Sequence, residues 1–483
     1  MGRKLTTLVL AMGLLASACG DDDEPGAGSE TTSAAETTLA ADAADTTDTT
    51  VAPESTAVET TTGGDAGGVT LDDSGRLVPA ECTGDDNVAN EDEGVTADSV
   101  NLATINVDLG PIADLGFSAS GVDLGHLTSV YVDAANAAGG VCGRRIDLEQ
   151  TKYDILGGAG PMGEACVQVT QDRTNLAALA TAYQDPLCVT DAGVALFDAY
   201  DVFESEMEVA GGLLVGRKPS VEDQYRATAQ YALDSGALDG KVGVFYGDGR
   251  TEFADIAEEF VLPMLDEAEV DYTAVRTDFP GPYVAEGNAV LTAAATDFVS
   301  HGVDTVLLFV SNMNLTGIQL ELSAQGLNPR YISMPIAENT ANDLFAESYG
   351  TKEISDGMEY LTYTYSPREV GENDLAAKSC NAQWTELTGE TVEPNTYDYY
   401  LVAITCVIVD EVLAALSLAG GDLNRESFIA GIEALPSHHA PGYLGEMDWS
   451  PDNRFGPAVF SVHDYDGETN GFTTREDFFE LRG

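Results

Sequence analysis

Strand-like and helix-like segments alternate along the chain from Ser99 onward, and this alternation restricts the fold more than any other feature. The run from Val100 to Val107 is apolar and rich in β-branched residues, as expected of a buried strand. The helix expected next carries apolar side chains at steps of three and four, and Gly139 and Gly140 end it. Further along, we predict a strand over 146–153, a helix over 161–171, a strand over 176–182 and a helical stretch over 190–200.

A second series of the same kind begins near Ser220, which looks like a helix N-cap followed by acidic residues. We predict strands over 241–246, 271–277, 303–310 and 330–334, with helices over 252–267, 288–300 and 315–325 between or after them. Such alternation gives parallel sheets with right-handed crossovers, so two series predict two α/β lobes. In this arrangement a ligand is expected in the cleft between the lobes, beyond the carboxyl ends of the strands.

The N-terminus has the order of a secretory signal. Residues 1–4 are short and basic, residues 5–15 are apolar but too short to span a bilayer, and small residues then precede Cys19. This order resembles a bacterial lipoprotein signal over residues 1–18, in which Cys19 is lipidated and becomes the mature N-terminus. The alternative is a plain secretory signal with an incidental cysteine. We therefore expect an extracytoplasmic protein, anchored by Cys19 to the outer face of the bacterial cell membrane.

The segment over residues 19–92 is rich in Thr, Ala, Asp, Glu and Gly and poor in large apolar residues. Such a composition cannot bury enough apolar surface to offset its ordering entropy, so we predict a disordered linker that follows the lipidated Cys19. The globular domain is predicted over residues 93–483, which are too many for one core. We expect no other apolar run to reach the length of a membrane-spanning helix.

The chain has a formal net charge of -61, which excludes nucleic acid as a natural partner because no basic patch is available to displace counterions. General solvation explains this acidity, and a cation-binding role is the alternative. The seven cysteines leave an even number once Cys19 is assigned to the lipid, and an even number in an exported protein indicates disulfides. Six cysteines allow fifteen connectivities. We favour a local scheme that pairs Cys82–Cys142, Cys166–Cys188 and Cys380–Cys406. Their spacing does not fit a metal site.

Two parts of the chain resemble the type I periplasmic binding proteins, in the branched-chain amino-acid (leucine-binding protein-like) group of ABC transporters. In the first, a strand ends in Leu109-Gly110-Pro111, a helix passes through Tyr131-Val132-Asp133, and Asn136 to Ile146 and then Asp154 follow. In the second, Gly445 to Arg454 and Phe460-Ser461-Val462 are similar to the closing hairpin and last strand of that family. The similarity covers nearly all of residues 95–470 and is weakest after Cys188.

The resemblance implies an α/β fold of two Rossmann-like lobes joined by a three-crossing hinge. Lobe I would hold about 95–215 and 362–453, and lobe II about 217–358 and 456–483, with crossings near 213–217, 359–363 and 454–460. It also implies a monomer with no cofactor and no catalytic activity. Such a protein closes its lobes on a small molecule, possibly an amino acid or a related compound, and presents it to the permease subunits of an ABC transporter.

The ligand positions of the family carry over unevenly. They correspond to Leu109, Gly110, Tyr183, Gln184, Phe253, Asn312 and, as the acid nearest to the family's ammonium-binding position, Glu338. That position itself falls near Ile336. A zwitterion is expensive to bury without partners for both charges, so a free amino acid requires Glu338 to point into the cleft.

Two other functions compete with transport. A surface sensor would use the same cleft and report to a signalling receptor. An exported hydrolase is the enzymatic alternative, because residues 116–121 superficially resemble a nucleophile elbow around Ser118. The glycine spacing does not fit that motif, and the segment opens the first helix and does not follow a central strand. The histidines lack the spacing of a catalytic metal site.

Overall fold

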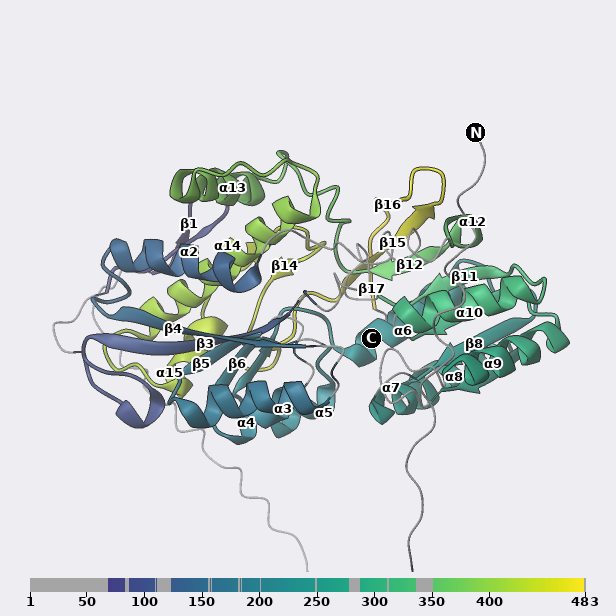
Figure 1. The fold of residues 1–483 in the computed structure, drawn as a ribbon, viewed down its shortest axis with the longest axis horizontal. Coiled ribbons are helices and arrows are strands. Elements are labelled where there is room, and N and C mark those ends of the chain that lie inside the picture. The colour runs from purple at the N-terminus through teal and green to yellow at the C-terminus, as the bar shows by residue number, and fades with distance from the viewer. Residues whose placement is uncertain are drawn as a thin grey trace, which may run out of the picture. The chain divides into compact units, whose positions relative to one another are not determined.

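In the computed structural model, the chain folds around two separate sheets (Figure 1). The structure describes residues 68–82, 87–108, 110, 123–154, 157, 159–180, 183, 185–199, 201–247, 250–277, 287–310, 312–335 and 351–481. The predicted signal, Cys19 and the hydrolase-like segment around Ser118 lie outside these residues.

The first sheet has five parallel strands in the order β4-β3-β5-β6-β7. Its strands are β3 (Ser99–Val107), β4 (Arg145–Tyr153), β5 (Ala177–Ala180), β6 (Ala195–Ala199) and β7 (Leu214–Gly216). The crossovers carry α2 (Leu124–Ala137), α3 (Ala159–Val167), the π-helical turn η3 (Gln168–Asp172), α4 (Pro186–Asp191) and α5 (Glu204–Val209). We call this sheet and its helices lobe I.

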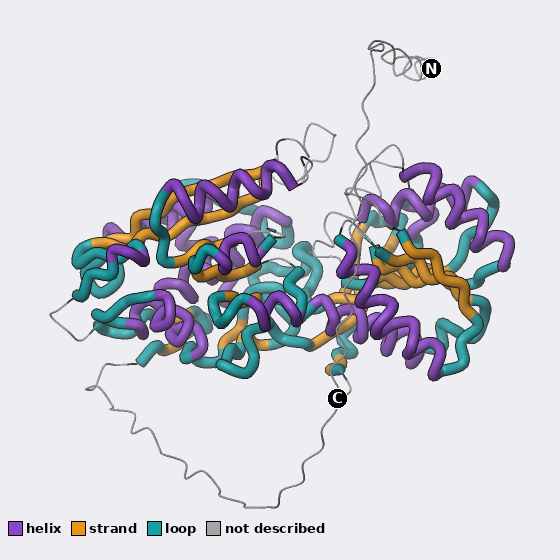
Figure 2. Tube along the Cα trace, turned by 90° about the horizontal axis from the view of Figure 1, so that it is seen from below, coloured by secondary structure: helices purple, strands orange, loops and turns teal. Residues whose placement is uncertain are grey.

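Helices cover both faces of the first sheet (Figures 1 and 2). Leu102 and Phe197 pack on the side of α2, α13 (Leu375–Thr388), α14 (Tyr397–Ala419) and α15 (Arg425–Glu433). The neighbouring positions Ala103 and Leu196 pack on the side of α3, α4 and α5. Because both faces are buried, β5 is a continuous apolar run, and β3 is buried from Leu102 to Val107 although Thr104 and Asn106 are polar.

The second sheet has the order β16-β15-β12-β11-β10-β8-β9, with β17 beside β15. Its strands are β8 (Val242–Tyr246), β9 (Tyr272–Arg276), β10 (Thr305–Phe309), β11 (Arg330–Ser333), β12 (Glu359–Thr362), β15 (Val459–Asp466), β16 (Gly471–Thr474) and β17 (Phe479–Glu480). Strands β8 to β12 are parallel to one another, and β15 joins β12 antiparallel. We call this sheet and its helices lobe II.

The helices of lobe II also lie on both faces of their sheet. They are α6 (Val221–Asp234), α7 (Thr251–Ile256), the π-helical turn η4 (Ala257–Val261), α8 (Leu262–Glu267), α9 (Gly287–His301), α10 (Asn312–Ala324) and α12 (Lys352–Ser355). Val306 and Leu308 of β10 pack with α9 and α10, whereas Leu307 and Phe309 pack with α6, α7 and α8. This alternation along one strand shows why its sequence is apolar throughout.

The chain passes between the two sheets three times. It leaves the first sheet after Gly216, and α6 already packs in the core of lobe II. It leaves the second sheet after Thr362, and Tyr363 packs in the core of lobe I. It returns between Trp449, which belongs to the core of lobe I, and β15.

A hairpin of β1 (Thr70–Leu71) and β2 (Leu77–Val78) lies within the segment predicted to be a disordered linker. Leu77 is buried against lobe I, Arg76 pairs with Asp410 of α14 at 2.8 Å, and Cys82 is bonded to Cys142. The predicted domain boundary at residue 93 therefore differs from the structure, in which folding begins by Gly68. The composition of the segment did not predict the hairpin, because only a few contacts hold it: the apolar side chains of Val69 and Leu77, one ion pair and a disulfide.

The predicted helical stretch over 190–200 is wrong. Helix α4 ends at Asp191, and residues 195–199 form strand β6. A short apolar run buried on both faces has no periodicity that separates strand from helix, which explains the error. The short elements α5 and β7 that follow had no expected counterpart in the sequence.

Helix α14 is apolar and long enough to cross a membrane, with a mean hydropathy of 2.2 over its best window, so the expectation that no such run exists was wrong. However, 78% of that window is buried inside the protein, as in the central helix of a folded core. The disulfide Cys380–Cys406 joins this helix to α13. The other disulfides are Cys82–Cys142 and Cys166–Cys188, so all three pairs follow the local scheme stated above.

Candidate ligand-binding site

The carboxyl ends of parallel strands mark the edge at which α/β sheets bind ligands, because the loops after neighbouring strands converge there. In lobe I this edge carries Asp108 after β3, Tyr183 after β5 and Asp201 after β6. In lobe II it carries Arg250 after β8 and Thr277 after β9. A ligand site is therefore sought among these residues and their neighbours.

The loops that follow β6 and β8 are in contact. Phe203, just before α5, packs edge-to-face on Phe253 of α7 with 5.1 Å between ring centroids. The guanidinium carbon of Arg250 lies 4.4 Å from the centre of the Phe203 ring. The Nη2 atom of Arg250 also lies 2.6 Å from a carboxylate oxygen of Glu206 in α5. These four residues, together with Asp201, are called the junction cluster, and they come from both lobes.

The start of α5 explains how Glu206 is held in this cluster. One of its carboxylate oxygens accepts a hydrogen bond from the backbone N–H of Phe203 at 3.1 Å, which satisfies a free donor at the helix start. The other oxygen pairs with Arg250. Burial raises the pKa of the Glu206 carboxyl, although the charge of Arg250 opposes this effect. Glu206 therefore joins the helix cap of one lobe to a cation of the other.

Asp201 adopts a backbone conformation that is unusual for a residue with a side chain. Its φ of 49° lies in the left-handed region, and such strain persists where the surrounding structure imposes it, often at functional sites. Burial raises the pKa of Asp201 to about 6, while the charges of Lys218 and Arg250 oppose the rise. Among the described residues, its carboxylate has no hydrogen-bond partner. Asp201 is thus a half-buried acid available to a cationic group at the carboxyl edge of lobe I.

A second acid beside the junction cluster gives the protein a specific pH dependence. Glu222 of α6 is 6% exposed and accepts a hydrogen bond from the backbone N–H of Glu204 at 3.0 Å. Burial raises the pKa of Glu222 from its usual 4.5 to about 7, and backbone hydrogen bonds oppose the rise. The folded state therefore binds this proton more tightly than the unfolded state, so the ionised form of Glu222 destabilises the fold.

We accordingly expect Glu222→Gln to be more stable than the wild-type protein above about pH 7, and the difference to vanish below about pH 4.5. Urea midpoints of both proteins, measured across this range, provide the test. A difference that is constant with pH would contradict the assignment to Glu222.

The fold has clear counterparts among solved structures. A branched-chain amino-acid ABC transporter protein from Thermus thermophilus with bound valine is 14% identical, with a TM-score of 0.59 over 80% of this chain and 97% of that one. A possible leucine/isoleucine/valine-binding protein from Rhodopirellula baltica is 13% identical, with a TM-score of 0.58 over 79% and 98%. A fatty acid ABC transporter substrate-binding protein from Thermomonospora curvata is 15% identical, with a TM-score of 0.57 over 80% and 94%.

The chain has the type I periplasmic binding protein fold. No family model and no curated protein sequence matches the chain. At these low identities the structural similarity establishes the fold alone. The ligand of this protein must therefore be inferred from its own residues.

Of the predicted ligand residues, Phe253 lies in the junction cluster. Tyr183 does not offer its side chain to a ligand, because it is fully buried and its hydroxyl donates to the carbonyl of Met162 at 3.2 Å. Its ring packs edge-to-face on Tyr153 with 5.7 Å between centroids, so it supports the edge from inside lobe I. This position corrects the prediction that the side chain of Tyr183 contacts the ligand.

Gly110 is exposed just after β3, where its N–H donates to the carboxylate of Asp108 at 3.0 Å. Asn312 is the first residue of α10, and its side chain is not among those described. Leu109, Gln184 and Glu338 lie outside the described residues. For these five residues the predicted ligand contacts stay predictions.

The sequence reasoning missed Asp201, Phe203, Glu206 and Arg250. The missing signal was strand β6: once residues 195–199 are recognised as a strand, Asp201 and Phe203 follow its carboxyl end and become candidates by the edge rule. Arg250 lies three residues before Phe253, which was predicted to bind the ligand. It belongs to the loop after β8, a strand that the sequence predicted correctly.

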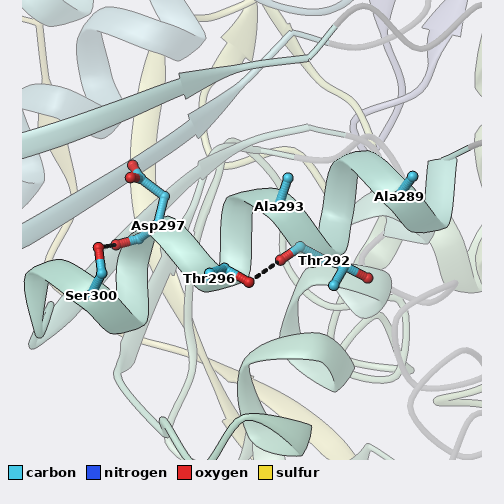
Figure 3. A pocket seen from close by; sticks show the side chains of 6 residues that line it. All are labelled: Ala289, Thr292, Ala293, Thr296, Asp297 and Ser300. Carbon is cyan, nitrogen blue, oxygen red and sulfur yellow. Dashed lines mark hydrogen bonds between the residues drawn. The ribbon is translucent and has the colours of Figure 1, made fainter.

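The surface hollow shown in Figure 3 is a poor ligand site for this fold. It encloses about 690 Å³ along the outer face of α9 and is lined by Ala289, Thr292, Ala293, Thr296, Asp297 and Ser300. The hydroxyl of Thr296 donates to the Thr292 carbonyl and that of Ser300 to the Asp297 carbonyl, at 2.7 and 2.8 Å. The two hydroxyls are therefore satisfied by their own helix.

A metal site finds no support within the described ranges. The single group of possible ligands found there is Cys380, Cys406 and Asp410. Both sulfurs are joined in a disulfide, and Asp410 is paired with Arg76. Burial raises the pKa of Asp410 to about 6 against the charge of Arg76, which fits a structural ion pair.

Proposed function

We propose that the protein is a lipid-anchored, extracytoplasmic solute-binding protein that captures a small ligand between the carboxyl edges of its two lobes and delivers it to an ABC transporter permease. The observation that carries the proposal is the junction cluster, in which polar and aromatic side chains from both edges lie together. Binding proteins of this kind are not enzymes, and the described residues offer no nucleophile paired with a base in this cluster.

The chemistry of the cluster favours a ligand with a carboxylate and an apolar body. Arg250, which pairs with Glu206 in this structure, is the cation that we propose for a ligand carboxylate, and Phe253 provides an aromatic surface in the same cluster. The similar structures described above include binding proteins for branched-chain amino acids and for fatty acids, which share these two features. We propose a ligand of this class for the present chain.

Asp201 decides whether the ligand also carries an ammonium group. A buried ammonium needs a partner, and the half-buried Asp201 carboxylate is the acid in the junction cluster that is not already paired. We propose that Asp201 takes the role that the sequence analysis assigned to Glu338. Leucine and 4-methylpentanoate form a matched pair of probes, because they differ by the ammonium group alone.

Thermal unfolding of the mature chain against amino acids, amides, short-chain and long-chain acids and polyamines tests the proposal. A ligand at one hundred times its Kd stabilises the native state by about 2.7 kcal/mol, which corresponds to a shift of several degrees. We expect a shift with leucine that exceeds the shift with 4-methylpentanoate, and Asp201→Asn should remove this preference. A panel in which no carboxylate shifts the midpoint would contradict the proposed ligand class.

Replacing Phe253 with alanine should weaken binding of the compound found in that panel by roughly tenfold or more, because an aromatic contact is lost at the site. Phe260→Ala is the matched control, since Phe260 is also half-buried but stacks under Arg226 at 4.1 Å, outside the junction cluster. Calorimetric titration gives both affinities. Equal losses in the two variants would mean that Phe253 acts through stability and not through contact.

The lipid anchor is tested separately. We expect Cys19→Ser to move the protein from the membrane fraction to the medium or periplasm, because a lipid chain provides the membrane affinity. Attachment that survives the substitution would refute lipidation at Cys19 and leave the ligand proposal intact.

A further inference from the structure

Two of the three passages between the lobes run side by side. The N–H of Gly216 donates to the carbonyl of Arg454 at 2.8 Å, and the N–H of Gly456 donates to the carbonyl of Lys218 at 2.9 Å. A Cβ atom on Gly456 would lie 1.9 Å from the carbonyl oxygen of Arg217, so glycine is required for this approach. The first and third passages therefore form one hydrogen-bonded unit, which we call the paired crossing.

The side chain of Arg217 leaves the paired crossing and enters the core of lobe I. It is 1% exposed and pairs with Glu411 of α14, which is fully buried. Its Nε lies 3.0 Å from one carboxylate oxygen, and its Nη2 donates to the other at 3.1 Å. The guanidinium carbon also lies 5.3 Å from the centre of the Tyr443 ring. Arg217 thus attaches the paired crossing to the central helix of lobe I.

Glu411 has a second partner in His438. The Nε2 atom of His438 lies 2.9 Å from the Glu411 oxygen that also accepts from Arg217, and its Nδ1 atom lies 3.0 Å from the carbonyl oxygen of Pro436. A carbonyl oxygen can only accept, and a carboxylate beside a guanidinium is ionised and can only accept. Both ring nitrogens therefore face acceptors, and both can donate only in the imidazolium form.

We propose that His438 stabilises the hinge only when its ring is protonated. With both nitrogens protonated, it holds Glu411 in place, and Glu411 holds Arg217 and the paired crossing against lobe I. When the ring loses one proton, the Nδ1 proton leaves first, because Nε2–H is held by the anionic Glu411 and Nδ1–H only by a neutral carbonyl. The Nδ1 lone pair then faces the carbonyl oxygen of Pro436, and this repulsion shifts the ring and loosens its hold on Glu411 and the paired crossing. His438 is thus a positioning residue that makes the relative motion of the lobes depend on pH. The inference rests on the proposed function, because lobe motion is what captures the ligand.

The groups around His438 are consistent with a single switch. Glu411 and Arg217 are the charged side chains that face it, and the Trp449 ring lies 5.9 Å away while donating from its indole N–H to the carbonyl of Gly216 at 2.9 Å. The neighbouring His439 faces a different acid, Asp374, at 3.0 Å and is 43% exposed. His439 is therefore a matched control for His438.

The first test reads the proton directly in the full mature chain. In a sample with ¹⁵N-labelled histidine, the two ring nitrogens of His438, assigned with His438→Gln, should both show the protonated signature at about pH 6. A neutral tautomer at that pH would overturn the proposal. This readout needs no ligand and no lobe motion, so it is independent of the proposed function.

The second test measures the lobes. Spin labels at Glu386→Cys in α13 and Glu259→Cys in η4, both exposed positions, report the distance between lobes I and II. We expect the distance distribution to broaden as pH rises from about 5 to about 9, to become insensitive to pH in His438→Gln, and to keep its response in His439→Gln. The proposal would be overturned by a wild-type distance distribution that does not change with pH. It would also be overturned if His438→Gln showed the same pH response as the wild-type protein.

Discussion

Replacing Glu411 with alanine is expected to destabilise lobe I by about 3–5 kcal/mol, because it leaves the buried Arg217 guanidinium without its anion and removes the acceptor that faces Nε2 of His438. Arg217 and Glu411 are 1% and 0% exposed, and His438 is 1% exposed, so water cannot replace the lost carboxylate. The loss should exceed that of a surface ion pair several-fold.

Tryptophan fluorescence during urea unfolding measures the stability of lobe I. The chain has two tryptophans, and both Trp384 and Trp449 are buried in the core of lobe I. Asp147→Ala is the control, because Asp147 is 39% exposed and pairs with Arg145 within the same lobe, where about 0–1 kcal/mol is expected. A loss below about 1 kcal/mol in Glu411→Ala would contradict the importance of the buried group.

Removing the disulfide Cys380–Cys406 is expected to destabilise lobe I by about 3–4 kcal/mol. The bond closes a loop with a sequence separation of 26 and joins α13 to the central helix α14. Its loss frees the unfolded chain, and both sulfurs leave a fully buried position. The double variant Cys380→Ala/Cys406→Ala avoids a free thiol, and the same tryptophan signal reports the midpoint. An unchanged midpoint would mean that packing between the two helices alone carries this part of the core.

The sequence correctly predicted the helices and strands that are marked by a clear pattern of apolar residues or by a cap within the element itself. Strands such as β8 and β10 are uninterrupted apolar runs between helices with a clear apolar face, and Ser220 caps α6 as its side chain accepts from the N–H of Asp223. Strand β6 failed because five apolar-rich residues fit both a strand and a buried helix turn. Periodicity thus predicts long elements well and short buried ones poorly.

The contacts that shape the hinge and the candidate site were not visible in the sequence, because they join distant positions. Arg217 and Glu411 are 194 residues apart, and Arg76 and Asp410 are 334 apart. No local spacing relates such pairs, and the two basic residues looked like ordinary charges of an acidic protein. The resemblance to binding proteins predicted where a ligand should lie, but the side chains at that edge had to come from the structure.

Small-angle X-ray scattering of the mature chain, with and without the compound found in the thermal panel, tests the central claim most directly. Capture between two lobes predicts that saturating ligand reduces the radius of gyration of the wild-type protein, because the lobes close. In Phe253→Ala, this reduction should need a higher ligand concentration. Tight binding with an unchanged radius of gyration, or binding that Phe253→Ala and Asp201→Asn leave intact, would show that the ligand is held elsewhere and would contradict the proposed site.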